Sequence, residues 1–193
     1  MSRTVRTFVA VEMSPEVMAR AGELTRVLAR AEAPVKWVEP RHMHLTLKFL
    51  GEIDILEVPD VCNAVAAAVE PLPPFEFMAV GSGAFPDARR PRTVWLGVGA
   101  GNDGLITLHD AIEDALRALG FRSEQRRFHP HLTLGRVRGN DPAGIGRLAA
   151  AIDQQREFAG GVSDVAEVVV MSSTLGREGP THEPLSHAEL RGR

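Results

Sequence analysis

The stretch His44-Leu45-Thr46-Leu47 returns 87 positions later as His131-Leu132-Thr133-Leu134. Apolar and polar residues alternate in both copies, which is typical of a β-strand, and residues two apart on a strand point to the same face. We therefore expect the histidine and the threonine of each copy on one face, and its two leucines on the other. Each copy thus predicts an imidazole and a hydroxyl group side by side.

The surroundings of the two copies are also related. The same shift aligns Phe8-Val9-Ala10-Val11 with Trp95-Leu96-Gly97-Val98, and His42 with His129. We interpret this as an internal duplication within one domain of residues 1–193, with halves at about 1–86 and 87–171 and a C-terminal segment at 172–193. Two copies of strand, helix, strand, helix, strand predict an α+β fold of two lobes related by a pseudo-twofold axis. The repeated histidines would then face each other.

Periodicity and helix-breaking residues give the remaining elements. A helix is expected to begin at Ser14-Pro15 and to bury one face at four- and three-residue spacing. Gly51 is expected to end the first repeat strand, and the Gly-, Pro- and Arg-rich segment 81–92 to be a loop between the halves. Further helices are expected at about 58–69, 103–119 and 143–157, and further strands at 5–11, 35–38, 75–80, 93–98, 131–137, 162–171 and 181–190.

Composition limits the functional classes. The chain has 193 residues, is 44% hydrophobic and carries a formal charge of -3, which argues against a protein that coats nucleic acid but leaves small or terminal nucleic-acid substrates open. Cys62 is the only cysteine, so no internal disulfide can form. No apolar leader and no run of about 20 apolar residues is found, so we expect a cytoplasmic protein.

Two histidines suit proton transfer near neutral pH, because an imidazole with a pKa of about 6.5 serves as an acid or a base. His44 and His131 are the candidate pair, and the hydroxyls of Thr46 and Thr133 could stabilise charge on a phosphoryl oxygen. Threonine is also a common packing residue of strands. The chain lacks the Gly-rich phosphate loop and the Gly-x-Ser-x-Gly nucleophile motif.

A metal site is the alternative interpretation of the histidines. His42 with His44, and His129 with His131, form His-x-His pairs that could chelate a metal. No nearby Asp, Glu or Cys completes either set. We therefore expect neither a metal nor another cofactor.

The second His-Leu-Thr-Leu copy lies within the segment Phe128–Arg136. In these two motifs the chain resembles the two-histidine phosphoesterase superfamily, and within it the bacterial LigT-like RNA 2',3'-cyclic phosphodiesterases. The resemblance extends from Phe8 to Ser172-Ser173. It implies two antiparallel-rich sheets with outer helices around a central cleft, and metal-independent opening of a cyclic phosphate to a 2'-phosphomonoester. It also implies that His44 donates a proton to the leaving 3'-oxygen and that His131 accepts one from water.

The resemblance suggests two substrate-binding residues, Phe49 and Arg136, which are equivalent under the 87-residue shift. Phe49 would stack on the terminal base, although it could equally be a core residue, and Arg136 would bind phosphate. One departure lies near the C-terminus, where many relatives have Tyr before a Glu-Pro-Leu-like run and this chain has His182.

The expected substrates are RNA ends that carry a 2',3'-cyclic phosphate, with 2'-5' ligation as a possible reverse reaction. Small cyclic phosphates or 2'-5' linked nucleotides are alternative substrates. A non-catalytic module that binds RNA or nucleotides is an alternative of another class, and the intact histidines and threonines of both motifs argue against it. No membrane association and no obligatory protein partner are expected.

Overall fold

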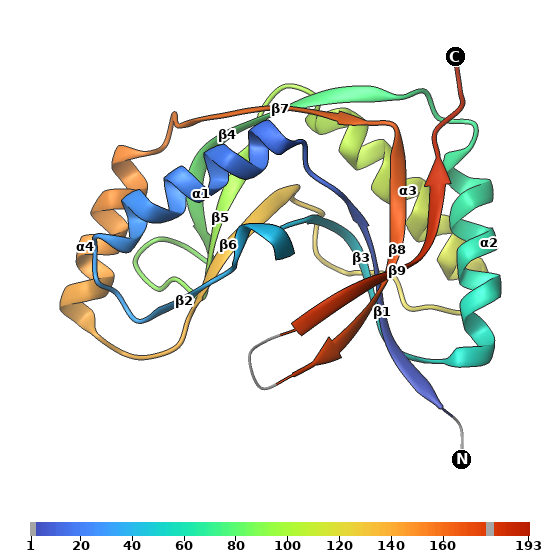
Figure 1. Ribbon diagram of the computed structural model, residues 1–193, viewed down its shortest axis with the longest axis horizontal. Coiled ribbons are helices and arrows are strands. Elements are labelled where there is room, and N and C mark those ends of the chain that lie inside the picture. The colour runs from blue at the N-terminus through green and yellow to red at the C-terminus, as the bar shows by residue number, and fades with distance from the viewer. Residues whose placement is uncertain (1–2, 177–179) are drawn as a thin grey trace.

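The computed structural model describes residues 3–176 and 180–193 (Figure 1). It confirms an α+β fold with two antiparallel sheets and outer helices. In chain order the elements are β1 (Thr4–Val11), α1 (Pro15–Ala29), β2 (Val35–Trp37), the 3-10 helix η1 (Pro40–His42), β3 (Leu45–Asp54), the 3-10 helix η2 (Ile55–Glu57), α2 (Val58–Val69), β4 (Phe75–Phe85), β5 (Thr93–Val98), α3 (Asn102–Ala118), β6 (His131–Val137), α4 (Pro142–Gln154), β7 (Ala159–Val165), β8 (Glu167–Leu175) and β9 (Pro180–Glu189).

Each sheet contains strands from both halves of the sequence. The first sheet has the order β3-β1-β8-β9 and the second has the order β2-β6-β5-β4-β7, with every pair antiparallel. Strand β4, from the first half of the chain, lies beside β5 in the second sheet, whereas β8, from the second half, lies beside β1 in the first. The two motif strands, β3 and β6, belong to different sheets and contact each other.

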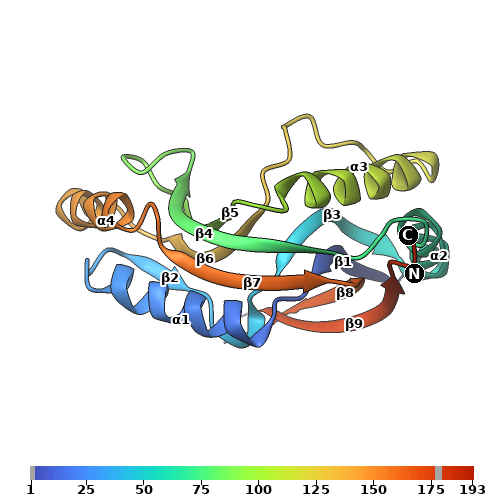
Figure 2. The ribbon, with the colours of Figure 1, turned by 90° about the horizontal axis from the view of Figure 1, so that it is seen from above.

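The helices are divided between the sheets in the same way. Helices α2 and α3 pack together against the first sheet, and α1 and α4 lie against the second (Figure 1). Figure 2 shows α1 alongside β7, with α2 at the other end of the molecule. The start of α1 is as expected, since the Ser14 hydroxyl accepts the Val17 N–H at 3.2 Å and Pro15 occupies the first turn.

One apolar core joins the two sheets. It includes the buried face of α1 (Val17, Ala21, Leu24 and Leu28), the valines of α2 and the leucines of both motif strands. Within the described residues, no helix is both long and apolar enough to span a membrane.

Three expected boundaries are wrong, two of them for a shared reason. Strand β3 continues through Gly51 and β4 continues through Gly81, because both glycines, with φ of +76° and +72°, lie beside irregularities in strand pairing that glycine can accommodate. The expected strand 162–171 is instead divided at Ala166. The chain changes sheets there, with β7 pairing with β4 and β8 with β1.

Candidate active site

The two motifs have the predicted division of faces. Leu45 and Leu47 are buried in the core, as are Leu132 and Leu134, with exposures of 0 to 3%. The histidine and threonine of each copy are half-buried on the opposite side. We call the sides of β3 and β6 that carry these histidines and threonines the site faces.

A β-bulge follows the threonine in both copies. Ala10 pairs with Thr46 and Val9 with Lys48, so Leu47 is the extra residue on β3. The pairing of β5 with β6 shifts in the same way, around Leu134. A bulge of this kind reverses the faces of the residues that follow it.

The first consequence concerns the two suggested substrate-binding residues. Strict alternation would place Phe49 in the core with Leu47, but the bulge returns it to the site face, where it is 55% exposed. The equivalent bulge on β6 turns the exposed Arg136 to the side of His131 and Thr133. Sequence periodicity could not decide between the two positions of Phe49.

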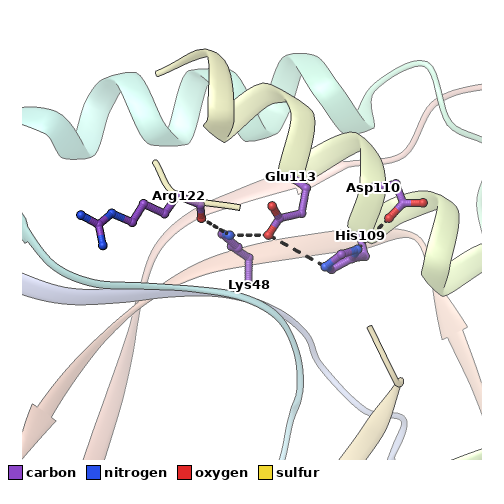
Figure 3. A network of polar contacts seen from close by, with 5 residues as sticks. All are labelled: Lys48, His109, Asp110, Glu113 and Arg122. Atoms are coloured by element: carbon purple, nitrogen blue, oxygen red, sulfur yellow. Dashed lines mark hydrogen bonds and ion pairs between the residues drawn. The ribbon is translucent and has the colours of Figure 1, made fainter. Parts of the chain in front are cut away.

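The second consequence is a buried cation. The bulge directs Lys48 into the core, where it forms an ion pair with Glu113 of α3 and donates to the Arg122 carbonyl at 2.8 Å (Figure 3). The equivalent position on β6 is Gly135, where a Cβ atom would lie 2.8 Å from the Trp37 ring. Position 135 therefore has no side chain that could form such an ion pair.

The same network reaches the second motif through His109 of α3. Its Nδ1 bonds Asp110 at 2.9 Å, and its Nε2 lies 4.0 Å from a Glu113 oxygen (Figure 3). The His109 ring stacks on Phe128 with centroids 4.1 Å apart and planes within 3°. Phe128 precedes His129-Pro130-His131, so β3 and the segment that enters β6 are tied to the same turns of α3.

Both motif histidines are held in the same way. The Nδ1 of His44 lies 3.0 Å from the His42 carbonyl, and the Nδ1 of His131 lies 2.7 Å from the His129 carbonyl. Because a carbonyl oxygen only accepts hydrogen bonds, each Nδ1 must carry the proton. The Nε2 atom of each imidazole is thereby left to exchange a proton with a substrate.

Aromatic rings surround the first motif histidine. The ring of His44 stacks on Phe8 at 4.7 Å and meets His182 of β9 edge to face at 5.1 Å. The 87-residue shift aligns Phe8 with Trp95, another aromatic residue. This repeated aromatic position was a sequence signal that Phe8 packs against the motif histidine. The resemblance marked His182 as a departure, but periodicity could not link it to the first motif, 138 positions away.

The second motif histidine has a similar environment. Phe85 meets His131 edge to face at 4.9 Å, and Trp95 lies 6.5 Å from it. A hollow of about 200 Å³ lies next to His129, lined also by Arg127 and Phe128. Phe85 lies in the segment that the sequence predicted to be a loop, so its contact with His131 was missed.

Burial favours the neutral form of both motif histidines. Burial, together with the smaller effects of the neighbouring His182 and His42, lowers the pKa of His44 to about 4, against the raising effect of the bond to the His42 carbonyl. Burial also lowers the pKa of His131, with smaller lowering effects from His129 and the Arg136 guanidinium. In the free protein near pH 7 both imidazoles are therefore neutral.

Several polar groups on the site faces are free to bind a ligand. In the part of the chain that the structure describes, neither the Thr46 nor the Thr133 hydroxyl has a hydrogen-bond partner, and Arg136 forms no ion pair. Over the same residues, no group of three or more His, Cys, Asp or Glu side chains is arranged to hold a metal.

The chain is similar to known proteins along nearly its whole length. A model of the 2'-5' RNA ligase superfamily matches residues 13–177. Proteins named RNA 2',3'-cyclic phosphodiesterase are 33% identical over 171 residues in Aeropyrum pernix, covering 88% of this chain and 94% of that protein, and 33% identical over 188 residues in Thermotoga maritima, covering 97% of each. The crystal structure of E. coli LigT complexed with 3'-AMP has the same fold, with a TM-score of 0.76 and 23% identity over 97% of this chain and 99% of that one.

Proposed function

Because the chain belongs to the 2'-5' RNA ligase superfamily of two-histidine phosphoesterases, we propose that it hydrolyses RNA 2',3'-cyclic phosphate ends to 2'-phosphomonoesters. One observation carries the proposal: the same carbonyl bond in both copies leaves Nε2 of His44 and of His131 available, on strands that contact each other. A pair of imidazoles presented in this way suits an acid and a base acting on a single phosphate.

The proposed reaction is a direct attack by water. His131 accepts a proton from water as the oxygen bonds to phosphorus, the bond from phosphorus to the 3'-oxygen breaks, and His44 gives its proton to that oxygen. The phosphate stays on the 2'-oxygen. The two histidines then return to their starting protonation states by exchange with solvent.

This mechanism needs one charged and one neutral histidine, whereas burial keeps both neutral in the free protein. A bound phosphodiester carries a negative charge, which raises the pKa of a neighbouring imidazole. By raising the pKa of His44, substrate binding therefore lets this histidine take up the proton that it later donates. The positive charge of Arg136 beside His131 opposes protonation there and so favours His131 as the base.

The remaining site residues are proposed to bind the substrate. The free hydroxyls of Thr46 and Thr133 donate to the phosphoryl oxygens, where negative charge grows during the attack. Arg136 makes a charge-assisted hydrogen bond to the phosphate, and the exposed ring of Phe49 stacks on the terminal base. We also propose that its binding partners are RNA ends or small nucleotides. We place it in the cytoplasm, because its single cysteine cannot form an internal disulfide and suits a reducing compartment.

The test is hydrolysis of a short RNA that ends in a 2',3'-cyclic phosphate, measured with EDTA present. We expect a 2'-phosphate product from the wild type, and losses of about 10²-fold or more for His44→Ala and His131→Ala. His187→Ala, a change of an exposed histidine paired with Glu167, is the matched control and should keep the wild-type rate.

Three results would count against the proposal: a 3'-phosphate product, loss of activity with EDTA, or a near wild-type rate for either folded motif variant. No turnover of the RNA, together with turnover of a small cyclic nucleotide, would keep the mechanism and change the substrate. RNA binding without turnover of either would indicate a binding module.

A further inference from the structure

His182 brings a third imidazole to the first motif. Its ring lies edge to face against His44, with centroids 5.1 Å apart and planes at 89°, and against Phe8 at 5.0 Å and 81°. The ring of His42 is 6.1 Å away. His182 comes from β9, two strands from β1 in the same sheet, so its position depends on the tertiary fold.

The second lobe has the same ring arrangement without the charge. Phe85 lies against His131 at 4.9 Å and 87°, and against His129 at 5.4 Å and 82°. His182 and Phe85 thus occupy corresponding places beside the two motif histidines. Of these two rings, only that of His182 can take up a proton.

Among the described residues, His182 forms no ion pair with a carboxylate. The titratable rings near it, within the same part of the chain, are His44, just before β3, and His42 of η1, and β1 contributes the uncharged Phe8. On β8 its partner in the pairing is Ser173, and the same row continues to a cation, Arg6 of β1, which pairs in turn with Glu52 of β3. In the described chain, the buried Nδ1 of His182 has no hydrogen-bond partner.

We propose that His182 is a positioning residue that packs against the proton donor His44 and, when His182 is itself protonated, opposes the protonation of His44. The role of His44 as proton donor rests on the proposed function. The contact between the two rings and the repulsion between their charges are independent of it.

The proposal gives the two motif histidines different responses to pH. Burial and His42 lower the pKa of His182, but His44, with a pKa of about 4, is the harder of the two to charge. As the pH falls, His182 takes up its proton first and His44 must then titrate beside a cation. His131 has Phe85 in the place of His182, so apart from burial only His129 and Arg136 oppose its protonation.

The direct test is an NMR titration of the imidazoles, with each of the seven histidines assigned by substitution. His182→Phe reproduces beside His44 the ring that His131 already has, and so removes the charge without removing the packing. We expect it to raise the pKa of His44 by about 0.6 to 2.4, which is the effect of a unit charge 5.1 Å away at effective dielectric constants of about 80 to 20. The pKa of His131 should not move.

The reciprocal change is the matched control. Phe85→His places a titratable ring against His131 and should lower the pKa of His131 while leaving that of His44 unchanged. An unchanged His44 pKa in His182→Phe would overturn the proposal. If that variant does not fold, His182→Gln serves in its place, and a wild-type His44 titration with no inflection as His182 charges would overturn it as well.

Activity gives a second and separable result. The pH profile of kcat/KM for cyclic phosphate hydrolysis reports ionisations of the free protein, so the pKa that belongs to His44 should move to higher pH in His182→Phe, by an amount that matches the NMR change. Failure of the wild type to hydrolyse the substrate would refute the proposed function and leave the NMR result to decide the coupling. A pKa change without a change in the profile would refute the link to catalysis.

Discussion

Replacing Lys48 by methionine tests whether the bulge on β3 creates a structural ion pair. The Lys48 side chain is 3% exposed and that of Glu113 is 11% exposed, so Lys48→Met leaves a carboxylate buried without its cation. Removing one member of a buried pair typically costs about 3 to 5 kcal/mol. The His109 Nε2 atom, 4.0 Å from Glu113, is too distant to replace the lost hydrogen bond.

The size of this effect can be measured by thermal and urea unfolding. For a chain of 193 residues, an unfolding entropy of about 2.1 cal/mol/K per residue converts the loss into a fall in Tm of roughly 7 to 12 °C. The double variant Lys48→Met/Glu113→Leu removes both charges and should recover part of the loss. We expect it to stay about 1 to 3 kcal/mol below the wild type, because the Arg122 carbonyl still lacks its donor.

Two results would refute this reasoning. The pair would not be a structural element if Lys48→Met lowered the free energy of unfolding by less than about 1 kcal/mol. A double variant no more stable than Lys48→Met would show that the loss does not come from the uncompensated charge of Glu113. Arg191→Met, which removes an exposed arginine paired with Glu70 and Glu189, is the control and should stay within about 0.5 kcal/mol of the wild type.

Three further predictions concern the site. The pKa of His44 is about 4 in the fold and about 6.5 in the unfolded chain, so this histidine alone should lower the free energy of unfolding by about 3 kcal/mol between pH 6.5 and pH 4. Urea unfolding of His44→Gln should show a smaller fall over the same pH range. Phe49→Ala should change stability little, because the ring is 55% exposed, but should raise KM for the RNA and not for a cyclic ribose phosphate that has no base; equal effects on both would exclude stacking. Arg136→Ala should raise KM by roughly 10- to 150-fold with a smaller change in kcat, and a kcat effect as large as that of His44→Ala would contradict a binding role.

The sequence was sufficient for the parts of the fold that depend on local periodicity. The spacing of Val17, Ala21, Leu24 and Leu28 predicted the buried face of α1, and the alternation in the two motifs predicted which side of each strand faces the core. The repeated His-x-Thr pattern also identified His44 as a candidate site residue. The duplication itself, with its boundaries, stays a prediction.

What the sequence could not supply depends on contacts between distant segments. The bulge at Leu47 is a property of pairing between β1 and β3, so periodicity could not show that Phe49 is exposed while Lys48 is buried. The contact of His182 with His44 depends on the order of strands in the first sheet. Tertiary pairing decided both features.

The central claim is that His44 and His131 act together on one phosphate. The most direct test compares single-turnover hydrolysis of the cyclic phosphate RNA by the wild type, both alanine variants and the double variant His44→Ala/His131→Ala. Groups that act as a unit are strongly non-additive, so the double variant should be about as slow as the slower single variant. Losses that multiply, with the double variant slower by the product of the two single effects, would contradict joint action on a single phosphate.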